Sequence, residues 1–125
     1  MSEVDALFQR AAAVAAAYRH GLGDRPVRAE ASLDELRAAF ARPLPDGPLP
    51  ADRVLDELVA AADPGLVQTA GGRFFGFVIG GSYPLAVAAD MVAAGWDQCA
   101  YNGVLTPAGQ AAEEAAGTWL KDLLG

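Results

Sequence analysis

One expected helix in this sequence carries almost no charge. From about Tyr83 to Trp96 the residues are apolar nearly all round the helix, and Asp90 is the only charged residue among them. A helix that is hydrophobic on every side is buried on every side. Because the chain has 125 residues and its other expected helices are short, they offer too little surface to surround this one. We therefore expect this helix to pack into an assembly larger than this chain.

The stretch before this helix combines aromatic residues with glycines. Phe74, Phe75 and Phe77 lie within four residues, and Gly80-Gly81 follows shortly after them. Glycine allows a positive φ or the close approach of another group. The pattern predicts an extended, half-buried segment that turns sharply at the two glycines and enters a helix near Tyr83. Such a segment serves either as the rim of a pocket or, more commonly, as a buried crossing between helices.

The rest of the chain shows helical spacing of apolar residues and clear helix boundaries. Ser2 and Ser32 begin capping-box patterns, and Thr106 before Pro107 is a typical helix start. Residues 42–50 hold four prolines and a glycine, which predicts a stiff linker. We expect helices over about 3–19, 32–42, 51–63, 83–96 and 107–124. The predicted fold class is therefore mainly α, with about five helices and an extended aromatic segment at 73–81.

Charge and composition exclude several classes of partner. With 16 acidic and 9 basic residues the net charge is −7, which argues against nucleic acid and anionic membrane surfaces. The uncharged run from Phe74 to Ala89 is interrupted by glycines and is shorter than the roughly 20 residues of a membrane span. Cys99 is the only cysteine, so no intramolecular disulfide forms and a reducing, cytoplasmic compartment is expected. The acidic N-terminus is not a signal peptide.

The sequence contains no complete catalytic constellation. His20 is the only histidine, and its place at the end of the first helix favours contact with the helix terminus over a pair with Cys99. Glu113 and Glu114 are adjacent, so they diverge by about 100° on a helix and cannot bind one metal ion together. Lys121, the only lysine, lies on the polar side of the last helix and is expected to be solvated. We expect no catalytic and no metal-binding residue.

Several short blocks resemble, in order and spacing, the pyridoxal-phosphate-dependent amino-acid decarboxylases. This group contains the aromatic-amino-acid, histidine and glutamate enzymes. The blocks are Gly71 to Gly81, Ala89-Asp90-Met91, Trp96-Asp97-Gln98, Thr106-Pro107 and Trp119 to Gly125. Residues 1–60 match only in helical layout.

The resemblance implies a fold and a set of pocket residues. The chain would be the N-terminal part of a fold-type-I transferase subunit that lacks the large-domain sheet. Residues 1–70 would form a helical dimerisation arm, and residues 71–125 a pocket-lining segment with the first helices of the cofactor domain. The residues implied to line the substrate pocket are Phe77, Val78, Ile79, Gly80 and Tyr101, the last usually contributed to the neighbouring subunit.

The resemblance also implies a function that this chain does not complete. The family removes the α-carboxylate of an amino acid with pyridoxal 5′-phosphate, and the family's cofactor-binding lysine, histidine and phosphate loop are not in this sequence. We therefore expect a fragment of a decarboxylase (a lyase) that is inactive alone and pairs with itself as a homodimer or with a downstream polypeptide. Gly71-Gly72 replaces the family's common His-Pro, which leaves the amino-acid substrate open. The alternative is a standalone helical interaction protein, derived from such an enzyme, that binds a partner through the apolar surface of residues 83–96.

Overall fold

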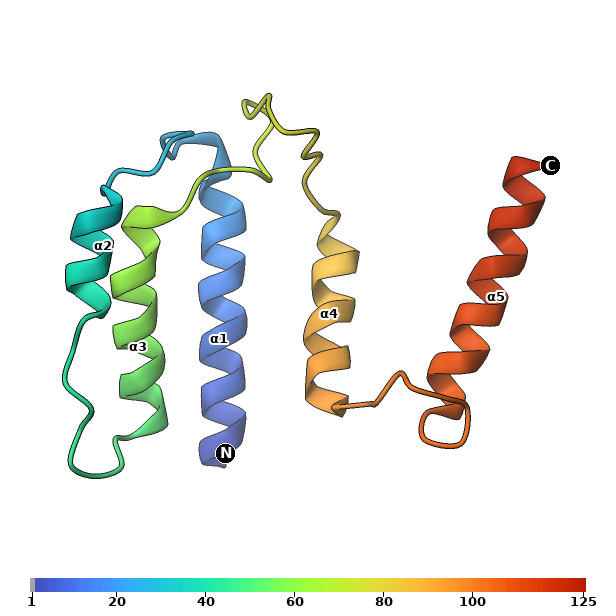
Figure 1. The fold of residues 1–125 in the computed structure, drawn as a ribbon, viewed down its shortest axis with the longest axis horizontal. Coiled ribbons are helices and arrows are strands. Elements are labelled where there is room, and N and C mark those ends of the chain that lie inside the picture. Colours follow the sequence, from blue (N-terminus) through green and yellow to red (C-terminus); the bar gives the residue numbers. More distant parts are fainter. Residues whose placement is uncertain (1) are drawn as a thin grey trace. The chain divides into compact units, whose positions relative to one another are not determined.

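The protein is mainly helical, as predicted. The computed structural model describes residues 2–125, and Figure 1 shows their arrangement as a ribbon. The α-helices are α1 (Glu3–His20), α2 (Leu33–Phe40), α3 (Ala51–Ala62), α4 (Pro84–Trp96) and α5 (Pro107–Leu124), with short 3-10 helices η1 (Gly21–Gly23) and η2 (Asp63–Gly65). Within this described part no residue is in a strand.

The helix starts follow the capping residues of the sequence. The Ser2 hydroxyl accepts a hydrogen bond from the Asp5 amide at 3.1 Å, and the Asp5 carboxylate accepts one from the Ser2 amide at 2.9 Å. Ser32 and Glu35 form the same reciprocal pair at the start of α2. At the start of α5 the Thr106 hydroxyl accepts from the Gly109 amide at 3.3 Å. These bonds satisfy amides that the first helical turn leaves without partners.

The chain consists of two compact units. The first unit ends at Gly81 and contains α1, α2 and α3, and the second runs from Ser82 to Gly125 and contains α4 and α5. In the first unit α3 packs against both α1 and α2, as the ribbon also shows (Figure 1). The predicted division into an arm at 1–70 and a pocket-lining part at 71–125 concerns function and stays a prediction.

Arg25 joins three parts of the first unit. Its guanidinium donates to the Asp63 carboxylate at 2.7 Å and lies 5.3 Å from the centre of the Tyr18 ring. Its carbonyl accepts a hydrogen bond from the Arg73 guanidinium at 2.7 Å. The hydrogen bond to Asp63 raises the pKa of Arg25 above its ordinary value. Arg25 thus links the end of α1, the end of α3 and the base of the aromatic segment.

Backbone hydrogen bonds reinforce this connection. The amides of Glu30 and Ala31 both donate to the Pro64 carbonyl, at 2.8 and 2.9 Å. The Gln68 amide donates to the Val27 carbonyl at 2.9 Å. The connector after η1 is therefore fixed against the segment that follows α3.

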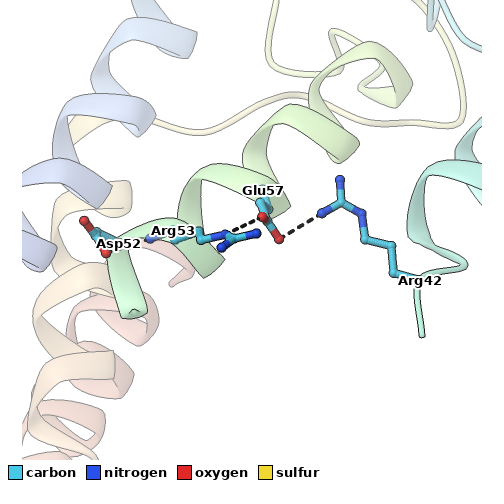
Figure 2. A network of polar contacts seen from close by, with 4 residues as sticks. All are labelled: Arg42, Asp52, Arg53 and Glu57. Atoms are coloured by element: carbon cyan, nitrogen blue, oxygen red, sulfur yellow. Dashed lines mark hydrogen bonds and ion pairs between the residues drawn. The ribbon is translucent and has the colours of Figure 1, made fainter. Parts of the chain in front are cut away.

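A second polar network lies on α3 and is drawn in Figure 2. The Glu57 carboxylate accepts hydrogen bonds from Arg53, one turn earlier, and from Arg42, at the start of the proline-rich linker, both at 2.8 Å. The hydrogen bond from Arg53 lowers the pKa of Glu57 and the charge of Arg42 lowers it further. A separate ion pair joins Arg10 of α1 to Asp56 of α3. These pairs hold the linker and α1 to α3.

The described residues bury no hydrophobic side chain. Among them just two residues are buried, Gln68 and Thr106, and both are polar. The Gln68 side-chain oxygen finds no hydrogen-bond partner within residues 2–125. Side chains between α1, α2 and α3, such as Leu36 and Leu55, are half-buried. The many apolar side chains of this sequence are therefore exposed or half-buried.

The predicted extended, half-buried aromatic segment is wrong at its centre. Phe77 and Val78 have φ values of 52° and 57°, in the left-handed region, and both side chains are exposed. No strand pairs with this segment in the part of the chain described, so no sheet holds it in an extended form. The sharp turn predicted at Gly80-Gly81 lies earlier, at Phe77-Val78, although Gly81 also has a positive φ of 80°. The helix then begins at Pro84, with Tyr83 as its N-cap, as predicted.

We expect Arg25→Met to destabilise the first unit. The change keeps most of the side-chain stem but removes the bond to Asp63 and the contact with Tyr18, which together are worth about 1–2 kcal/mol of unfolding free energy. Thermal unfolding followed by circular dichroism measures the loss. Arg53→Met is the matched control, because the Arg53 side chain is 62% exposed and its ion pair lies within one helix. Equal melting temperatures for the two variants would contradict the assigned role of Arg25.

The capping box of α2 predicts a pH dependence. Hydrogen bonds from the Ser32 amide and then from its hydroxyl lower the pKa of Glu35 from its ordinary value of 4.5. Because the folded pKa is lowered, this carboxylate stabilises α2 above pH 4.5, and the contribution is lost as the pH falls through the folded pKa. An NMR titration of the Glu35 carboxyl carbon measures the shift.

The matched variants for this titration are Ser32→Ala and Ser2→Ala. Ser32→Ala removes the hydroxyl and keeps the amide, so the pKa of Glu35 should return part of the way to 4.5. Ser2→Ala removes the corresponding hydroxyl of α1 and should leave Glu35 unchanged. A Glu35 that titrates at 4.5 in the unmodified chain shows that the capping box is absent in solution.

Candidate functional site

The centre of the aromatic segment is a left-handed turn. The Ile79 amide donates to the Gly76 carbonyl at 3.1 Å, and the two residues between them, Phe77 and Val78, both have positive φ. These features are those of a type I′ turn, whose central positions favour Asn and Gly. A non-glycine residue in this region costs about 1–2 kcal/mol, and a β-branched residue such as Val78 is especially unfavourable there. The turn is therefore strained at two consecutive residues.

The side chains of this turn project into solvent. Phe75 and Phe77 each keep 92% of their surface exposed, Val78 is fully exposed, and Ile79 is 45% exposed. The base of the segment is fixed by the bond from Arg73 to the Arg25 carbonyl. The predicted pocket residues Phe77, Val78, Ile79 and Gly80 thus follow one another around an exposed turn, and their role as pocket walls stays a prediction.

The fifth predicted pocket residue, Tyr101, belongs to the second unit. It lies on the loop between α4 and α5 and is 81% exposed. The loop is shaped by Asn102, whose side-chain oxygen accepts from the Val104 and Leu105 amides at 3.0 and 3.1 Å. It starts at Asp97, which ends α4 in the left-handed conformation. Tyr101 is thus placed by a short, internally bonded loop.

A cavity of about 700 Å³, which no sequence pattern predicted, lies between this loop and α5. Its lining comprises Ala100, Tyr101, Asn102, Thr106, Gly109, Gln110, Glu113, Glu114, Gly117, Thr118 and Lys121. Gly117 leaves open space where a side chain would otherwise stand, and Gly109 contacts the Thr106 side chain. The sequence signal was the recurrence of glycines on one side of α5. The cavity offers polar groups of both charges, and all of its charged residues are exposed.

The cavity does not suit the cofactor of the resembling family. A lysine that forms a Schiff base needs a pocket that excludes water. Lys121 is exposed, so the lysine of this chain does not fit that role. Residues 2–125 also contain no group of three or more His, Cys, Asp or Glu side chains that could hold a metal ion.

Helix α4 presents apolar side chains around its circumference. Tyr83, Leu85 and Trp96 are strongly exposed, Met91 and Val92 are about half exposed, and Val87 is half-buried. This helix, in which Asp90 is the one charged residue, therefore combines an apolar composition with an exposed surface. Exposed apolar surface of this kind is typical of protein–protein interfaces, ligand-binding grooves and aggregation-prone surfaces.

Comparison with protein families, with curated proteins and with solved structures gives no match. Within residues 2–125 no helix has the length and apolar character needed to cross a membrane.

We expect Leu85→Lys to weaken self-association of the chain. Burying one leucine side chain contributes about 1.5–3 kcal/mol, so replacing it by a charge should raise the dissociation constant about tenfold or more. Sedimentation velocity over a concentration series measures this change. Leu44→Lys makes the same substitution at a leucine of similar exposure in the proline-rich linker, outside α4. If both variants associate as the unmodified chain does, α4 is not the associating surface.

Proposed function

We propose that this chain is the N-terminal segment of a pyridoxal-phosphate-dependent amino-acid decarboxylase. In this proposal it supplies subunit contacts and walls of the substrate pocket, and a second polypeptide supplies the cofactor site. The observation that supports it most is the surface: the described residues bury no hydrophobic side chain while α4 and the turn at 76–79 expose many.

The exposed helix supports the contact role. Interfaces between permanently associated subunits are hydrophobic and resemble a domain core that has been divided. Helix α4 carries one charge, Asp90, and its exposed residues include an aromatic residue at each end, Tyr83 and Trp96. Large aromatic side chains contribute strongly to interfaces because each buries about 150–250 Å². Such a helix is suited to a position inside an obligate assembly.

The exposed aromatic side chains support the pocket role. Phe77 on the turn of the first unit and Tyr101 on the loop of the second are both available to a neighbouring molecule. Binding pockets are lined mainly by hydrophobic and aromatic side chains, with a few polar groups that set orientation. The proposed substrate is therefore an amino acid with an aromatic or other bulky side chain. The proposed reaction is loss of its α-carboxylate.

The proposed partner is one that supplies the cofactor-binding residues, which this chain does not contain. Since Lys121 does not fit a Schiff-base role, the complete site requires another polypeptide or a further segment of the same protein. This need separates the proposal from the alternative, a helical interaction protein without activity. The alternative draws on the same exposed face of α4, so reconstitution is the discriminating experiment.

We expect reconstitution to restore decarboxylation. The chain is co-expressed with a polypeptide that carries the cofactor-binding part of such a decarboxylase, and release of carbon dioxide from aromatic amino acids is measured with pyridoxal phosphate present. Activity that disappears when this chain is omitted is the expected result. A mixture that is inert, although the two polypeptides co-purify, favours the interaction protein.

The pocket assignment is tested in the same system. Phe77→Ala and Tyr101→Ala should each lower kcat/KM about tenfold or more, because each removes an aromatic wall from the bound substrate. Leu44→Ala is the matched control, since it removes a side chain of similar exposure outside the proposed pocket. Unchanged kcat/KM and substrate preference in both aromatic variants would show that the pocket lies elsewhere.

A further inference from the structure

The turn at Gly76 to Ile79 shows a conflict between local preference and observed conformation. Phenylalanine, valine and isoleucine favour extended backbone, and three of them occur in a row at positions 77–79. The structure instead places Phe77 and Val78 in the left-handed region, where such side chains are rare. A conflict of this kind marks a segment whose alternative conformations lie close in free energy.

No packing contact compensates for the strain of this turn. Strained backbone persists where the surrounding structure determines it fully. Here Phe77 and Val78 are almost completely exposed, and the hydrogen bond from the Ile79 amide to the Gly76 carbonyl closes the turn. One solvent-exposed hydrogen bond is a weak constraint, because water replaces it easily. The left-handed form therefore competes with the extended form in the free chain.

Gly76 and Gly80, on either side of Phe77 to Ile79, allow these residues to change conformation without moving the rest of the chain. A side chain at Gly76 would meet only the Phe74 ring, at 3.5 Å, and Gly80 has open space around it. The segment is fixed before and after these glycines. The Phe74 amide donates to the Gly71 carbonyl at 3.1 Å, and Gly81 approaches the Ala70 backbone closely. Backbone rotation is thereby confined to residues 76–80.

We propose that residues 76–80 form a two-state conformational switch between the left-handed turn and an extended form. In the turn, Phe77 and Val78 both project into solvent. In the extended form, successive side chains point to opposite sides, so the two residues separate. As a consequence that rests on the function proposed above, the switch opens or closes the pocket wall that these residues form.

Two substitutions at one position test the switch in the full chain. Val78→Gly removes the steric cost of positive φ and should raise the ratio of left-handed to extended form about tenfold. Val78→Pro fixes a negative φ at position 78 and drives the preceding residue to extended backbone, so it should abolish the left-handed form. Ile79→Ala is the control, since it trims an apolar neighbour that has no positive φ.

Phe77 is the reporter, because it is unchanged in all of these chains. Its backbone carbon shifts and the nuclear Overhauser effect between its amide and α-protons give the fraction in the left-handed form, and neither needs cofactor or partner. We expect the left-handed fraction of Phe77 in the unmodified chain and in Ile79→Ala to lie between the fractions measured for Val78→Gly and Val78→Pro. If the left-handed fraction of the unmodified chain equals that of Val78→Gly, the chain has a single left-handed state. If it equals that of Val78→Pro, the chain lacks the turn. Either result overturns the switch and leaves the reconstitution experiment unaffected.

Discussion

The side chain and the carbonyl of Arg25 connect the parts of the first unit that are farthest apart in sequence. The guanidinium reaches Asp63 after α3 and lies against Tyr18 on α1, while the carbonyl receives Arg73. Arginine suits this position because its planar group can donate hydrogen bonds and contact an aromatic ring at the same time. Directional polar contacts thus join the helices of this unit, and none of these helices buries an apolar side chain fully. Their apolar faces remain available for other contacts.

The sequence predicted the helices well because the signals that begin them are local. Helix starts at Ser2, Ser32, Tyr83 and Thr106 depend on residues within one turn, and the structure has a helix at each of them. Such signals act locally and do not depend on what the helix packs against. Exposure is a different kind of property, because it depends on every other part of an assembly. Apolar spacing predicts which face a helix will bury, while the surface that covers it can belong to another molecule.

The aromatic turn and the cavity beside α5 show where local reasoning stops. Phe77 and Val78 contradict their own backbone preference, so no pattern of propensities could place them in the left-handed region. The cavity arises because the loop that carries Tyr101 returns toward α5, and the path of a loop is set by its own hydrogen bonds at Asn102. The pocket residues indicated by family resemblance were located on these two irregular segments. Their role as walls of a substrate pocket stays a prediction.

The ion pair between Arg42 and Glu57 has a consequence for the order in which the first unit folds. It closes a loop across 15 positions, whereas Arg10 and Asp56 are separated by 46. Closing the longer loop costs about 1 kcal/mol more in chain entropy, before the stiffness of the proline-rich linker is counted. That stiffness restricts the ends of α2 and α3 to fewer relative positions and favours their encounter further. We therefore expect the α2–α3 hairpin to form before α1 packs against it.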